Sequence, residues 1–110
     1  MRHRMLERHG RDVTITRFSF ETENEYGDAQ KTEHEEIVTA RVDRLNQGEV
    51  VHGPDGEDHT VDVDFFVKDS VTVDDEAPVS EFTVDGKTYS VLVADDQDGG
   101  LIRARCQREM

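Results

Sequence analysis

The sequence has little of several residue types that define whole classes of protein. Among 110 residues it has one cysteine, two prolines and no tryptophan. A lone Cys106 excludes an internal disulfide scaffold and fits a reducing compartment. Apolar runs are only a few residues long, and the basic residues 2–4 are not followed by the apolar stretch of a secretory signal. We therefore expect neither a membrane span nor a leader.

Bulky apolar residues are also scarce. Leu, Ile, Val and Phe together make 26 residues, of which 14 are valine. This share lies just above the level at which a chain stays disordered, so we expect a thin core. The length allows one small domain, which we assign to residues 1–110.

What the chain has in excess is negative charge. It holds 13 Lys and Arg against 26 Asp and Glu, a net charge of −13, with ten Arg and only three Lys. At ordinary salt such a chain repels itself, but molar salt shortens the Debye length to about 3 Å. The composition therefore indicates adaptation to a salt-saturated cytoplasm, as in haloarchaea. Repulsion of a polyanion such as DNA, or attraction of a basic partner, is the functional alternative.

The hydropathy pattern predicts a mainly β fold, a small antiparallel barrel or sandwich of six or seven strands. Residues 1–10 suit a short helix that ends at Gly10. A change of face predicts a bulge near Arg17, and Asp85-Gly86 is a strong hairpin signal. Long polar loops are expected near residues 21–36 and 48–59, and shorter turns at 46–48 and 95–100. The expected strands are 12–20, 37–45, 49–52, 59–68, 81–84, 87–93 and 101–106.

One group of residues has the chemistry of a metal site. His52 and His59 bracket three carboxylates, Asp55, Glu57 and Asp58, and a hairpin could bring both imidazoles together. In so acidic a chain, however, histidines stand beside aspartates by chance, and no tight ligand motif is present. We therefore predict no metal and no cofactor. Were a metal bound, His52 and His59 would be its candidate ligands. No nucleophile elbow, P-loop or dinucleotide glycine motif is present, so we predict no enzyme.

The two ends of the chain are basic, unlike the middle. In a barrel the first and last elements often meet, which would join these arginines into one cationic patch. They would then either pair with nearby acids or dock the acidic face of the next subunit, a head-to-tail contact that can close into a ring. The arginines are Arg2, Arg4, Arg8 and Arg11 at the start, and Arg103, Arg105 and Arg108 at the end.

The order of segments resembles a known family. A short helix runs into His9-Gly10 and Val13-Thr14-Ile15-Thr16-Arg17, then a loop with Tyr26-Gly27-Asp28 follows. Late in the chain stands the hairpin Val84-Asp85-Gly86-Lys87-Thr88-Tyr89-Ser90-Val91. This order is similar to that of the head-closure or head–tail joining proteins (connectors or stoppers) of tailed viruses. The acidic segment 47–59 departs from that pattern.

The resemblance implies a structural virion protein, here of a haloarchaeal virus. Such a protein forms a ring of six or twelve copies in the neck, between the portal or its adaptor and the tail terminator or tail tube. The ring is assembled in the host cytoplasm, closes the head, retains DNA and docks the tail. Viral DNA would pass through an acidic lumen without specific binding, because phosphate contacts need cations. The candidate lumen or gate residues are Glu49, Asp55, Glu57 and Asp58.

Three other functions stay open, one of them a hydrolase whose catalytic residues the sequence does not reveal. The chain could be a tail terminator or an adaptor of the same neck, although an adaptor would be more helical. It could also be a soluble halophilic β-barrel module that binds a small molecule, or a metal at His52 and His59.

Overall fold

The computed structural model describes residues 10–21 and 30–109. Within these ranges the chain forms six strands and no helix, which confirms the mainly β class. The helix predicted over residues 1–10 lies outside the described residues, apart from Gly10. No helix in the described part of the chain is long and apolar enough to cross a membrane.

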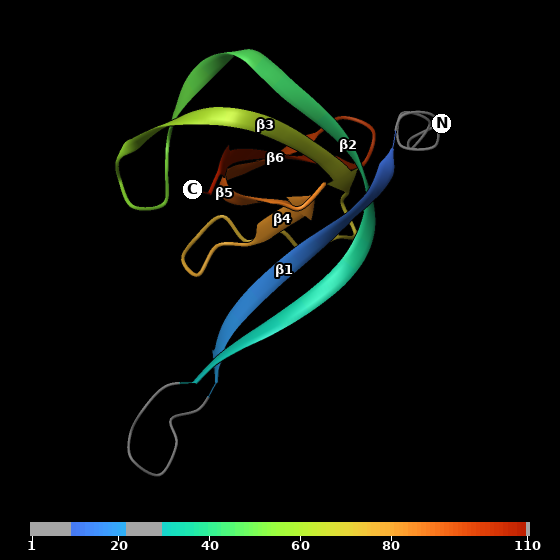
Figure 1. The fold of residues 1–110 in the computed structure, drawn as a ribbon, viewed down its shortest axis with the longest axis vertical. Helices are drawn as coiled ribbons and strands as arrows, with labels where there is room; N and C mark the ends of the chain where they lie inside the picture. Colours follow the sequence, from blue (N-terminus) through green and yellow to red (C-terminus); the bar gives the residue numbers. More distant parts are fainter. Residues whose placement is uncertain (1–9, 22–29, 110) are drawn as a thin grey trace.

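All six strands belong to one antiparallel sheet (Figure 1). The strand order is β1-β2-β3-β6-β5-β4, and it closes because β4 pairs back onto β1 through Thr14–Thr16 and Glu81–Thr83. A closed order leaves no unpaired sheet edge where all six strands run side by side. The strands are β1 Arg11–Glu21, β2 Gln30–His52, β3 Asp58–Lys68, β4 Glu81–Val84, β5 Lys87–Gln97 and β6 Leu101–Arg108.

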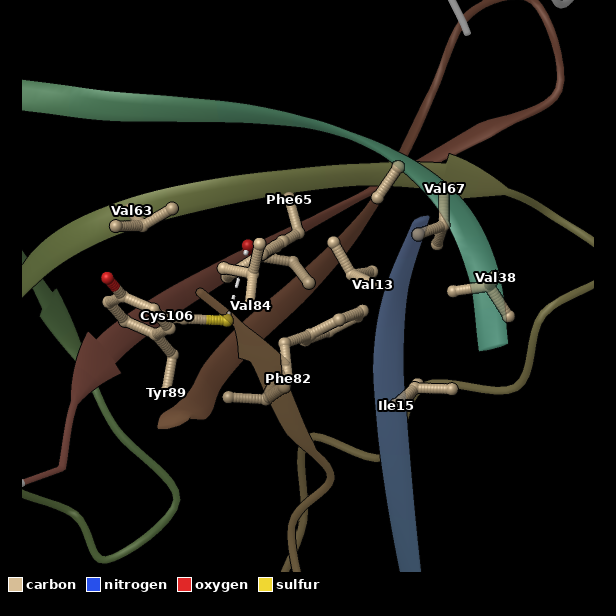
Figure 2. Close-up of a cluster of buried hydrophobic side chains, with 13 residues drawn as sticks. Val13, Ile15, Val38, Val63, Phe65, Val67, Phe82, Val84, Tyr89 and Cys106 are labelled. Carbon is tan, nitrogen blue, oxygen red and sulfur yellow. Dashed lines mark hydrogen bonds between the residues drawn. The ribbon is translucent and has the colours of Figure 1, made fainter. Parts of the chain in front are cut away.

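The core lies inside this closed sheet and is built from alternate residues of each strand. Figure 2 shows Phe65 of β3 stacked on Phe82 of β4, with ring centroids 4.5 Å apart, and Tyr89 of β5 edge-on to Phe65 at 5.6 Å. Cys106 is fully buried, as predicted, and this burial raises the pKa of its thiol. The remaining core residues are small: Val13, Ile15, Val38, Ala40, Val63, Val67, Val84, Val91 and Ala104. A core of valines and three aromatic rings matches the expected thin core.

The predicted hairpin at Asp85-Gly86 is confirmed. Both residues have positive φ, 53° and 74°, as a two-residue turn of the primed type requires. The turn joins β4 to β5 with Val84 opposite Lys87.

The loop predicted over residues 21–36 is wrong at residue 21 and at residues 30–36, and residues 22–29 lie outside the described residues. β1 continues to Glu21 and β2 starts at Gln30, and the two strands keep one register from Arg11↔Ala40 to Glu21↔Gln30. Backbone pairing with β1 therefore overrides the polar composition of residues 30–36, because a strand with solvent on its outer face tolerates polar residues. The predicted bulge near Arg17 is absent from this register.

The predicted turn at residues 46–48 is also wrong. β2 runs on as one strand to His52, and these residues form an irregularity between Arg44 and Glu49 in its pairing with β3. Gly48 lets the two strands approach closely there, since a Cβ would clash with Thr60 Cγ2 and would force that side chain to move. At the other end of the sheet, β5 extends to Gln97, so the predicted loop over 95–100 shrinks to a tight turn.

Two hairpins extend beyond the closed part of the sheet (Figure 1). In the β1–β2 arm, residues 17–21 of β1 pair only with residues 30–34 of β2, because the pairing of β1 with β4 ends at Thr16. In the β2–β3 arm, residues 49–52 pair with 58–61, and the pairing of β3 with β6 begins only at Val63. The arms start from opposite ends of the closed sheet.

Candidate functional site

The two histidines of the metal hypothesis point to opposite faces of the β2–β3 arm. His52 lies opposite Asp58, and Val51 lies opposite His59. Because alternate residues of a strand face opposite sides, His52 shares a face with Asp58 and not with His59. The structure accordingly joins His52 Nδ1 to Asp58 at 3.3 Å and His59 Nε2 to Asp55 at 2.8 Å. The expected site with both imidazoles does not form.

Among the described residues, one group of three metal-ligand side chains lies close together, and it is Asp55, Glu57 and His59 at the tip of the β2–β3 arm. Asp55 accepts a hydrogen bond from the Glu57 backbone N–H at 3.0 Å and faces the His59 ring. The hydrogen bond from Glu57, and to a lesser extent the contact with His59, lower the pKa of Asp55. The Asp55 carboxylate in turn raises the pKa of His59. These contacts explain the arrangement as an ordered turn without any ion.

Of the basic residues predicted to dock a partner, Arg105 is buried inside the protein. Its side chain is 9% exposed and contacts Asp64 at 3.1 Å and Glu49 at 2.6 Å. Glu49 reaches it from the end of the β2 irregularity. Arg105 therefore stabilises the fold, and Glu49, expected to face a channel, is its partner.

Two further arginines also pair within the chain. Arg103 contacts Asp95 at 3.1 Å, and Arg11 holds Asp85 at 2.6 Å. Arg108 donates its backbone N–H to Asp62, while no ion pair of its side chain occurs among residues 10–21 and 30–109. Internal pairing thus explains three of the four described arginines. Arg2, Arg4 and Arg8 lie outside the described residues.

The first and last strands were expected to meet, but β1 and β6 are not neighbours in the sheet. One end of the closed sheet is nevertheless cationic. On four strands, the alternate residues that point into the core are followed at this end by a basic residue. We call these four basic residues the cationic rim. The four residues are Arg11, Arg44, Lys87 and Arg108, and each stands two positions along its strand from an inward-facing residue: Val13, Val42, Tyr89 and Cys106, respectively. Arg44 and Lys87 were not expected in this patch, although the alternation of apolar residues along their strands places them there.

Large apolar side chains are exposed on and near the arms. Phe20 on the β1–β2 arm is 61% exposed, Val50 on the β2–β3 arm is 65% exposed, and Ile37 on β2 is 72% exposed. Scattered exposed apolar residues are ordinary, but Phe20 and Val50 stand on the arms, and Ile37 lies on the outer face of the closed sheet near the β1–β2 arm.

A pair of carboxyl groups lies on the outer face of β4 and the end of β6. Glu81 is paired with Ser90 across the strands, and Ser90 Oγ donates to Glu109 at 2.5 Å. Partial burial and the neighbouring Glu109 raise the pKa of Glu81 to about 7, and the hydrogen bond from Glu81 lowers the pKa of Glu109.

Comparison with known proteins gives no family assignment. No protein-family model matches the chain, and no curated protein is significantly similar to it in sequence.

Proposed function

We propose that this chain is a structural protein of the head–tail neck of a tailed virus that infects a halophilic host. In this proposal it is a small β-barrel subunit that associates with copies of itself in a ring, between the portal or its adaptor and the tail. It closes the head, retains the DNA and docks the tail, and it catalyses no reaction.

The observation that carries the proposal is the pair of hairpin arms with exposed apolar side chains. Two-stranded hairpins are marginal alone in water, and Phe20 and Val50 are left uncovered on them. Covering these side chains with a neighbouring subunit would remove apolar area from water and hold the arms in place. A monomeric binding module has no need of such arms.

The charge of the chain fits a passage for DNA. The tip of the β2–β3 arm exposes Asp55, Glu57 and Asp58, and the chain carries −13 overall. Carboxylates that face a channel would repel phosphate and let DNA pass without binding.

The closed sheet argues against a module that binds a small molecule in its interior. Phe65, Phe82 and Val91 fill the centre and are 0% exposed. A tail terminator of the same neck would use the same features, so it stays the second candidate.

The proposal is tested by loss of the protein in the virus that encodes it. Depletion should give DNA-filled heads that leak DNA and lack tails, together with free tails. A Phe20→Ser variant should give the same defect without unfolding, and Phe20→Leu, which keeps the apolar side chain, should not. Normal tailed particles after complete depletion would overturn the proposal.

A further inference from the structure

Only two of the four basic side chains of the cationic rim form ion pairs within the described residues. Asp85 already binds two of its members, Arg11 through two hydrogen bonds of 2.6 and 3.1 Å, and Arg44 at 3.8 Å. The contact with Arg11 lowers the pKa of Asp85 most, and the contact with Arg44 lowers it further, so Asp85 is a carboxylate at neutral pH. The side chains of Lys87 and Arg108 form no ion pair in the described part of the chain.

These two cations line a hollow. The hollow has a volume of about 380 Å³, and Arg44, Lys87 and Arg108 stand around it. The core residues Val63 and Tyr89 also line it, so it offers apolar surface beside the charges. Asp62 is the acidic residue at its edge. The site thus suits a segment with carboxylates next to apolar side chains.

The opposite end of the molecule carries a segment of that kind. On the β1–β2 arm and just below it, Glu33, Glu35 and Ile37 are alternate residues of β2, so they share one face, and all three are exposed. Phe20 lies on the same face, because its cross-strand partner is Lys31 in the same alternation. Neither Glu33 nor Glu35 forms an ion pair within residues 10–21 and 30–109.

The spacing of the charges agrees. Glu33 and Glu35 are two residues apart on one strand, which separates their Cα atoms by about 7 Å. Tyr89 lies opposite Arg108, so Lys87 is the diagonal neighbour of Arg108, also at about 7–8 Å between Cα atoms. Two carboxylates can therefore meet two ammonium or guanidinium groups at once.

One chain cannot make this contact with itself. β1 starts at the rim with Arg11 and runs to Glu21 on the arm, a length of about 33 Å for its 11 residues. The start of β1 and the β1–β2 arm hence lie at opposite ends of each copy (Figure 1). Contact between them joins copies head to tail, and such a contact can close into a ring.

We infer that the cationic rim of one copy receives the face of the β1–β2 arm with Glu33 and Glu35 from the next copy, with Lys87 and Arg108 as the partners of these carboxylates. This inference rests on the self-association in the proposed function and names its interface. Duplex DNA is a less fitting occupant, because the rest of the chain is strongly negative. A free anion would meet the two cations but would leave the apolar lining residues Val63 and Tyr89 uncovered.

A charge exchange tests the inference. We would measure the association constant of the full chain by sedimentation, in enough KCl to keep it folded. The rim variant Lys87→Glu/Arg108→Glu and the arm variant Glu33→Lys/Glu35→Lys should each lose about tenfold or more in self-association, and an equimolar mixture of the two should regain it. Lys68→Glu at the far end of β3 and Asp98→Lys in the β5–β6 turn each reverse one charge in the same sense, away from both surfaces, and should leave association unchanged.

Several results would overturn the inference. It fails if the mixture does not regain association, if the two control variants lose as much, or if the wild-type chain stays monomeric at millimolar concentration. Binding of inorganic phosphate or of duplex DNA to the wild-type chain, lost in the rim variant, would replace the arm with a different occupant. Circular dichroism checks folding, and Lys87→Gln/Arg108→Gln is the milder rim variant. If wild type and all variants assemble equally, the interface is wrong while the proposed neck role stands; absence from virions would sink the role itself.

Discussion

Replacing Arg105 with methionine separates a structural role of this residue from a docking role. The Arg105→Met variant keeps most of the side-chain length and removes the charge. It leaves the Asp64 carboxylate, which is 8% exposed, without its cation at 3.1 Å. A docking arginine would be lost at no cost to folding, whereas a buried partner of two carboxylates would not.

The structure sets the size of the effect. Breaking a buried ion pair by removing one partner costs about 3–5 kcal/mol, mostly because the other charge stays buried. Since Glu49 is 61% exposed and regains water when Arg105 is lost, only Asp64 is left uncompensated. We therefore expect the free energy of unfolding to fall by about 3 kcal/mol. In the double variant Arg105→Met/Asp64→Leu most of this loss should return, because no buried charge remains.

Urea unfolding at molar KCl measures these differences. Arg103→Met is the matched control, since its pair with Asp95 is 31% and 40% exposed and should be worth less than about 1 kcal/mol. If Arg105→Met costs no more than Arg103→Met, the buried network does not hold the sheet, and Arg105 returns to the list of docking residues.

Three further predictions concern solution conditions. The pKa of Glu81 is raised to about 7, so the contribution of Glu81 to stability is complete below about pH 4.5 and is lost as the pH rises through 7. After solvent screening we expect the free energy of unfolding to fall by about 1 kcal/mol between pH 5 and 8, and this fall should be absent in Glu81→Gln. An equal pH slope in both proteins would refute this prediction. Dilution from molar to millimolar KCl should loosen the fold, because screening of the net charge of −13 is lost; an unchanged far-UV circular dichroism spectrum would count against it. A chelator, or His52→Ala, should leave the melting temperature unchanged, and a large fall would restore the metal hypothesis.

The sequence predicted the parts of the fold that depend on local signals. Alternation in β3 located the buried residues from Val61 to Val67, and Asp85-Gly86 located the hairpin because few other residue pairs adopt two positive φ values. The burial of Cys106 followed from the apolar residues on its strand face.

Features that depend on pairing with distant residues escaped the sequence analysis. The polar segment 30–36 gave no strand signal of its own, and it forms part of β2 because β1 pairs with it. The continuity of β2 through residues 45–48 likewise depends on β3.

The candidate site was predictable only in part. The basic ends of the chain pointed to Arg11 and Arg108, but the ion pairs of Arg103 and Arg105 depend on which strands become neighbours. Arg44 and Lys87 lie in the middle of the sequence, away from its basic ends, and join the rim only when the sheet closes.

The central claim, that this chain is a subunit of a viral neck, is tested most directly by locating it in intact particles. Purified virions would be labelled with an antibody against the chain and imaged, and the number of copies per particle would be counted by quantitative mass spectrometry. We predict label confined to the junction of head and tail, with a fixed copy number that matches a closed ring. Purified, infectious particles that lack the polypeptide, or label spread over the capsid surface or the tail tip, would contradict it.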